Sequence, residues 1–185
     1  MQTTPPQHDV FAYAFQEIAD QETVALLEET PARWGRMPPL ARLLVVETGR
    51  FLRENKLLAK GRNLAHTGKN VGLIGGTSRG SLTTDLGFAK TLQQGPELAS
   101  PALFGYTLAN IPLAEAANHY GLTGPVYAVI DEDDPFQSAC REARHHLATS
   151  ATTDYILACR FDDLGAGTDQ PLRITFGLIQ HTHAH

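Results

Sequence analysis

Five short apolar runs in this sequence alternate with segments that have the pattern of helices. Parallel strands need a crossover connection, so strands that are separated by helices favour parallel pairing. The last two runs are close enough in sequence to pair antiparallel. The sequence therefore predicts an α/β fold with a mixed, mostly parallel five-stranded sheet and helices on both faces. The expected strands are residues 10–15, 71–74, 126–130, 155–159 and 172–179.

Several helices have recognisable boundaries. Pro38 and Pro39 open the predicted helix at 38–58, and Gly61 is available as its stop. Gly121 is the corresponding stop for the third helix. Residues 21–34 have a mixed pattern that fits either a helix or a long connection. The expected helices are residues 38–58, 84–94, 107–120 and 135–147.

The run Val126–Ile130 is apolar at every position. A strand that is covered by helices on both faces has this continuous pattern, whereas a half-exposed strand alternates between apolar and polar residues. We therefore expect residues 126–130 to form a central strand of the sheet.

Length and charge limit the classes of partner. The chain has 185 residues, which fits one domain over 10–179 between flexible tails at 1–9 and 180–185. The net charge is −5 and the 15 lysines and arginines are scattered, so we expect no nucleic-acid partner. The first residues lack the pattern of a signal peptide, and no apolar stretch is long enough to span a membrane.

Two cysteines, Cys140 and Cys159, are too few for a disulfide framework or a cysteine-based zinc site. This cysteine usage fits a reducing compartment, so we expect a cytoplasmic location. The alternating histidines of the tail at 180–185 have no fixed geometry for a metal.

Glycines follow the predicted strand 71–74. Gly75, Gly76, Thr77 and Gly80 are expected to form a tight turn, where the backbone needs the freedom that side chains deny. The spacing matches the first half of a phosphate-binding loop. Residues 81–82 are Ser and Leu where that loop requires Lys and then Ser or Thr, so we expect no nucleotide cofactor.

Four acidic residues, at 131–134, precede the helix at 135–147. They partly match a calcium-binding loop, but Pro135 and Phe136 occupy positions that such a loop cannot give them. Capping is the stronger interpretation, because a carboxylate at a helix start accepts from free backbone N–H groups. We therefore expect Asp133 and Asp134 to act as helix N-caps, and we expect no metal.

Three segments carry a resemblance to a known family. Residues 71–80 (Val-Gly-Leu-Ile-Gly-Gly-Thr-Ser-Arg-Gly), 100–110 and 119–125 resemble the N-terminal half of β-ketoacyl synthases, members of the thiolase superfamily. Residues 36–42 and 158–162 also resemble segments of that family. The resemblance covers residues 36–164 and implies half of a thiolase-like fold.

The resemblance implies that the family's chemistry is lost. Counting along the motifs places Asp133 where ketosynthases carry a nucleophilic cysteine, and a carboxylate cannot hold an acyl group as a thioester. Cys140 lies seven residues further on, about two helical turns or roughly 10 Å away. We also expect the two histidines that the family carries in its second half to be absent. Chain-length factors have lost the same cysteine, and they pair with a competent ketosynthase.

The leading hypothesis is a non-catalytic accessory subunit in fatty-acid or polyketide-type biosynthesis, as a homodimer or as a heterodimer with a ketosynthase. An acyl carrier protein is a further possible partner. Two alternatives stay open: an acyl-thioester decarboxylase or hydrolase that uses an aspartate, and a homodimer that binds an acyl chain or a carrier protein. In the resembling family, residues 107–120 and 126–130 lie at the dimer contact. The residues expected to contact a partner or an acyl chain are Phe104, Tyr106, Leu108, Tyr127 and Val129.

Overall fold

A computed structural model of the chain describes residues 8–11, 27–93, 95–163 and 172–181. Its five strands form one sheet in the order β1-β5-β4-β2-β3. β2, β3 and β4 run parallel, β5 is antiparallel to β4, and β1 is antiparallel to β5. Four of the five strands thus point the same way, as the α/β prediction required. The strands are β1 (His8–Phe11), β2 (Val71–Thr77), β3 (Val126–Ile130), β4 (Tyr155–Asp162) and β5 (Arg173–Gln180).

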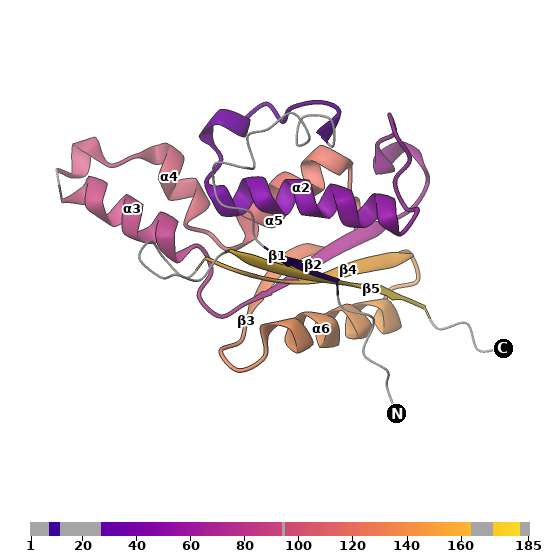
Figure 1. Ribbon diagram of the computed structural model, residues 1–185. Coiled ribbons are helices and arrows are strands. Elements are labelled where there is room, and N and C mark those ends of the chain that lie inside the picture. The colour runs from indigo at the N-terminus through magenta and orange to yellow at the C-terminus, as the bar shows by residue number, and fades with distance from the viewer. Residues whose placement is uncertain (1–7, 12–26, 94, 164–171, 182–185) are drawn as a thin grey trace.

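Helices cover both faces of the sheet (Figure 1). α2 and α5 lie on one face, α6 lies on the other, and α3 and α4 project beyond the carboxyl end of β2. Among the helices of the described residues, none is long and apolar enough to cross a membrane. The helices are α2 (Pro39–Glu54), α3 (Leu82–Leu92), α4 (Pro101–Tyr106), α5 (Asn110–Tyr120) and α6 (Pro135–Thr149), with short 3-10 turns η2 (Trp34–Arg36), η3 (Leu64–His66) and η4 (Pro96–Leu98).

The core has two parts, one on each face of the sheet. Under α2 and α5, the rings of Phe51 and Phe176 stack with centroids 5.1 Å apart, and Phe161 is fully buried. On the other face, α6 buries Phe136 and Ala139 against the sheet. Burial of these apolar side chains is the main stabilising term of the fold.

Helix α2 ends four residues earlier than the sequence predicts. The N–H of Leu57 donates to the carbonyl of Leu52 (2.9 Å), and the N–H of Lys56 donates to that of Arg53 (2.9 Å). These two bonds form a Schellman C-cap, whose left-handed position usually holds glycine and here holds Lys56 at φ 57°. The expected stop, Gly61, instead donates its N–H to Glu28 Oε2 (2.6 Å).

The central position predicted for β3 is wrong. Within the described residues β3 pairs only with β2, so it lies at an edge of the sheet. Helices α5 and α6 pack against it. This packing accounts for the apolar sequence, since the pattern reports covered faces and carries no information on strand order.

Other boundaries differ less. β1 begins at His8, so residues 8–9 belong to the sheet rather than to a tail, and residues 12–15 of the predicted first strand lie outside the described residues. Residues 21–26 of the ambiguous segment 21–34 do as well. α5 starts at Asn110 instead of Thr107, and it ends at Gly121 in the left-handed conformation (φ 70°), as expected.

Glu47 is a buried carboxylate in the middle of α2. Its side chain is 0% exposed and accepts from Arg50 Nη1 at 2.9 and 3.0 Å. Burial raises the pKa of Glu47 to about 7, and Arg50 opposes this effect. The native state therefore binds a proton more readily than the unfolded chain, and stability falls as pH rises from about 4.5 to about 7.

We predict that Glu47→Gln removes this pH dependence. Relative to the parent, the variant should gain up to about 3 kcal/mol of unfolding free energy between pH 5 and pH 8. Urea unfolding at both pH values measures the difference. Glu97→Gln, at an exposed position in η4, is the control and should follow the parent. Parallel pH profiles for the parent and Glu47→Gln would contradict the prediction.

Candidate functional site

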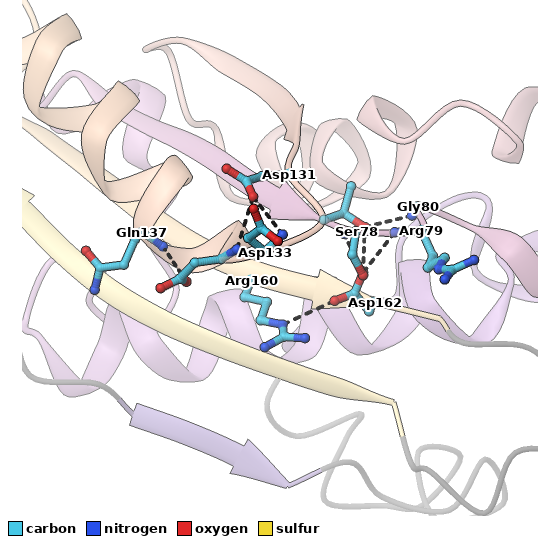
Figure 2. Close-up of polar contacts among 10 residues, drawn as sticks. Ser78, Arg79, Gly80, Asp131, Asp133, Gln137, Arg160 and Asp162 are labelled. Carbon is cyan, nitrogen blue, oxygen red and sulfur yellow. Dashed lines mark hydrogen bonds and ion pairs between the residues drawn. The ribbon is translucent and has the colours of Figure 1, made fainter.

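The loop between β3 and α6 is organised around Asp131. Asp131 Oδ1 accepts from the backbone N–H groups of Asp133 (2.9 Å) and Asp134 (3.0 Å), as Figure 2 shows. Its other oxygen accepts from the hydroxyl of Ser138. The Ser138 hydroxyl first, and then the two N–H groups, hold the pKa of Asp131 below its usual value. Asp131 therefore stays ionised and occupies donors that could otherwise bind a substrate anion.

Asp134 is the N-cap residue of α6, and its Oδ1 accepts from the N–H of Gln137 at 3.1 Å. Pro135 follows at the first helical position. Asp133 is exposed and lies one residue before the N-cap, so the expectation that it also caps the helix is wrong; its N–H donates to Asp131. The loop thus presents a carboxylate to solvent at the position where the family resemblance places a nucleophile.

Both cysteines are buried, one on α6 and one on β4. Burial raises the pKa of Cys140 to about 11. Burial also raises the pKa of Cys159, with a smaller contribution from Cys140. Neither thiol ionises near neutral pH, so neither has the reactivity of a catalytic thiolate.

A second polar cluster lies at the carboxyl ends of β2 and β4. Asp162 Oδ1 accepts from Thr77 Oγ1 (2.9 Å) and from the backbone N–H groups of Ser78 (2.8 Å) and Arg79 (3.2 Å). It also accepts from Ser78 Oγ (3.0 Å), while Oδ2 accepts from Arg160 Nε (3.2 Å). Asp162 thereby fixes the turn that leads from β2 towards α3 (Figure 2).

The predicted glycine turn is partly wrong. Gly75, Gly76 and Thr77 belong to β2, and the turn begins at Ser78 and includes Gly80 at φ 61°. A Cβ on Gly76 would lie 1.7 Å from the carbonyl oxygen of Pro135. The glycine is therefore required because the start of α6 approaches the strand, and no turn occurs there.

The expected contact residues differ in accessibility. Phe104 and Leu108 are each 56% exposed, on and just after α4. Tyr106 is buried and donates to Glu115 (2.8 Å), so it cannot contact a partner. Which of the α4 side chains is buried depends on how the helix packs, and the sequence alone did not indicate this.

On β3, Tyr127 and Val129 are half-buried. Tyr127 donates its hydroxyl to Glu142 on α6 at 3.3 Å. Sequence reasoning missed Ile130, which is 76% exposed at the end of this edge strand. Its exposure depends on strand order, and no local signal reveals it.

A cleft of about 390 Å³ lies between residues 29–33 and α5, away from the acidic loop. Glu115 accepts from Tyr106 and lies 3.7 Å from Arg33. Burial lowers the pKa of His119, whose Nε2 lies 3.3 Å from the carbonyl oxygen of Leu27. These polar walls do not suit an acyl chain. The lining residues are Glu29, Thr30, Pro31, Ala32, Arg33, Glu115, Asn118 and His119.

The sequence matches no family model and no curated protein. Solved structures do match, and they define the class of fold: this is a ketosynthase-like α/β domain with half of a thiolase-like fold, as the motifs implied. One match is the ishigamide ketosynthase/chain length factor, at 15% identity and a TM-score of 0.70, over 94% of this chain and 49% of that one. The chain thus spans about half the length of this relative.

Two further matches support the same fold. A chain in the complex of the ketosynthase ApeO with its chain length factor ApeC from Xenorhabdus doucetiae has a TM-score of 0.61 and 16% identity, over 96% of this chain and 77% of that one. A β-ketoacyl synthase from Burkholderia phymatum STM815 has a TM-score of 0.61 and 12% identity, over 83% and 46% of the two chains.

Proposed function

We propose that this chain is a non-catalytic, ketosynthase-like accessory subunit that assembles with a ketosynthase in fatty-acid or polyketide-type biosynthesis. The observation that carries this proposal is the loop of Asp131–Asp134. An exposed carboxylate stands at the nucleophile position, and the N–H groups beside it already bind Asp131. This arrangement supports neither thioester formation nor stabilisation of an oxyanion.

The alternative of an enzyme that hydrolyses or decarboxylates acyl thioesters with an aspartate is less well supported for the same reason. Such a reaction needs a positioned donor for the developing oxyanion, and the nearest donors are occupied. Turnover of malonyl or acyl thioesters that disappears in Asp133→Asn would favour this alternative over the accessory role.

Assembly is supported by the β3 edge, which pairs with no strand other than β2 in the part of the chain that the structure describes, and by exposed apolar side chains. β3 contains no charged residue, and Ile130 at its end is 76% exposed. An uncharged, exposed edge strand is a template for pairing with another chain. The α3–α4 region adds further exposed apolar side chains, which are costly to leave in water. These are Leu86, Leu92, Leu98, Phe104 and Leu108.

The structural neighbours favour a ketosynthase as the partner. Two of them come from ketosynthase and chain-length-factor assemblies. In the ApeO–ApeC complex the matched chain is covered over 77% of its own length, so a chain not much longer than this fold takes part in such a complex. A homodimer that binds an acyl chain or an acyl carrier protein is the competing arrangement.

We predict that the chain co-purifies with a full-length ketosynthase of the same organism and changes the length or yield of its product. Ile130→Asp should weaken the complex at least about tenfold, because it places a charge on the apolar edge. Ala59→Asp is the matched control, since Ala59 is exposed and lies after α2, outside the strands of the sheet. Titration of the ketosynthase with each variant measures the affinity.

Absence of a complex, together with unchanged products, would rule out the accessory role. A homodimer in native mass measurements that retains a lipid or a carrier protein would favour the competing arrangement. Equal weakening by Ile130→Asp and Ala59→Asp would show that the contact does not involve the β3 edge.

A further inference from the structure

Ser81 is the N-cap residue of α3, but its hydroxyl does not cap the helix. A serine at this position ordinarily accepts from a backbone N–H two or three residues further on. Ser81 is 2% exposed, and its Oγ has no hydrogen-bond partner in the part of the chain that the structure describes. A buried hydroxyl without a protein partner is costly, and a bound water or ion is a common explanation.

Two carboxylates lie beside this hydroxyl. The N–H of Asp85 donates to the carbonyl of Ser81 at 2.9 Å, so the side chain of Asp85 lies one helical turn above Ser81. Ser81 and Asp163 are partners in an isolated parallel β-bridge, and bridge partners direct their side chains to the same face. The side chain of Ser81 is therefore directed towards the space that Asp85 and Asp163 flank.

Asp85 also has an oxygen that the surrounding protein leaves unbonded. Its Oδ1 is buried and has no hydrogen-bond partner within the described residues. Asp163 is 6% exposed and accepts from the hydroxyl of Thr83. Burial first, and then the charge of Asp163, raise the pKa of Asp85. Two carboxylates that approach each other in this way repel unless a proton or a cation lies between them.

The ligand atoms at this position are all oxygens, from two carboxylates and the hydroxyls of Ser81 and Thr83. Such a set suits a hard cation such as Mg²⁺ or Ca²⁺, whereas zinc and copper favour nitrogen and sulfur ligands. The charge of −2 on the two carboxylates exceeds the roughly +0.5 at the N-terminus of α3. Asp85 is only half-buried, so water can complete the coordination shell.

We propose that Ser81, Asp85 and Asp163 bind a divalent hard cation, Mg²⁺ or Ca²⁺, where α3 begins and β4 ends. The cation would bond Ser81 Oγ and Asp85 Oδ1, and it would join two segments that are far apart in the sequence. Because α3 projects beyond the sheet (Figure 1), a cation at its base would restrain the α3–α4 region. The cation site does not depend on the accessory role.

The affinity follows from the number of charged ligands. The site has two carboxylates, and no group of three or more histidine, cysteine, aspartate or glutamate side chains suited to a metal occurs within the described residues. A site with so few charged ligands should have a Kd of about 10⁻⁴–10⁻³ M.

A proton shared between Asp85 and Asp163 is the competing explanation for the same contacts. A carboxyl whose pKa is raised in the native state stabilises the fold at low pH. With a shared proton, stability would therefore fall as the pH rises through the pKa of Asp85, and it would not respond to cations.

The test uses the full-length chain, freed of metal with EDTA and titrated calorimetrically with MgCl₂ and, in a separate arm, with CaCl₂. One cation should bind per chain, and the arm with the lower Kd identifies the occupant. Asp85→Asn removes a charged ligand and should weaken binding at least about tenfold, whereas Ser81→Ala removes a neutral one and should weaken it about two- to fivefold. Asp133→Asn, at an exposed acid before α6, is the matched control and should bind like the parent.

Thermal unfolding provides a reading that a purely structural role would not give. In EDTA, Ser81→Ala and Asp85→Asn should be at least as stable as the parent, because they remove an unbonded buried hydroxyl and a repelling charge. A cation at about tenfold excess over Kd should raise the Tm of the parent by about 3–5 °C, against NaCl of equal ionic strength. The Tm of Asp85→Asn should not rise. Should Asp85→Asn fail to fold, the weaker binding of Ser81→Ala decides the test.

The cation site is overturned if neither cation binds at up to about 10 mM, or if Asp85→Asn binds as tightly as the parent. Equal loss of binding in Asp85→Asn and Asp133→Asn would indicate a general charge effect and would also overturn it. A parent whose stability falls with rising pH and does not respond to either cation would overturn it in favour of the shared proton.

Discussion

Gly76→Ala should destabilise the protein by about 3 kcal/mol or more, a large part of the stability of a domain of this size. The added Cβ would lie 1.7 Å from the carbonyl oxygen of Pro135 and 2.5 Å from its carbonyl carbon. Both atoms belong to the backbone at the start of α6, so no side-chain rotation can relieve the overlap. The midpoint of urea unfolding measures the loss.

Gly75 and Gly87 provide comparison positions for this prediction. A Cβ on Gly75 would lie 2.4 Å from the ring of Phe161, which is a side chain and can shift slightly. A Cβ on Gly87, within α3, would have nothing within 4 Å. Gly75→Ala should therefore be less damaging than Gly76→Ala, and Gly87→Ala should stabilise by about 0.5–1 kcal/mol. A Gly76→Ala variant as stable as Gly87→Ala would mean that β2 and the start of α6 are not in contact.

Asp162→Ala should cost about 3–5 kcal/mol, because it removes a buried carboxylate that accepts from four donors, one at the end of β2 and three in the turn that follows it. The turn at Ser78 and Arg79 would also lose the acceptor that holds its backbone in place. Arg79 is exposed in this turn, so trypsin should cut after it much faster in the variant. Urea unfolding and the rate of cleavage at Arg79 are the two measurements.

Asp154→Ala is the matched control for Asp162→Ala. Asp154 accepts a single backbone hydrogen bond, from Asn70 at 2.7 Å, in an exposed position before β4. Its loss should cost about 1 kcal/mol and should leave cleavage at Arg79 unchanged. Equal costs for the two alanine variants would show that the Asp162 cluster does not hold the turn.

The candidate site was only partly predictable from the sequence. Asp134 before Pro135 is a local capping signal, and the structure places Asp134 at the N-cap. The role of Asp131 was missed, although it binds residues only two, three and seven positions away. Four consecutive acids offer no local criterion for which of them accepts the free N–H groups, since that choice depends on how the chain leaves β3.

Asp162 illustrates the other limit of prediction. It lies 85 residues from Thr77, and the hydrogen bond between them exists only because β2 and β4 are neighbours in the sheet. A family resemblance marked residues 158–162 as a unit but did not indicate this contact. Glu47 was likewise unpredictable, because a carboxylate on a helix is normally on its exposed side.

The sequence by itself determined the features that depend on neighbouring residues. These are the alternation of strands and helices, the end of α5 at Gly121 and the start of α6 at Pro135. Only the tertiary structure decided the order of the strands, and with it the open edge of β3, the burial of Tyr106 and the need for glycine at position 76. Local signals act through backbone conformation within a few residues, whereas edges and close approaches arise from packing between segments far apart in the chain.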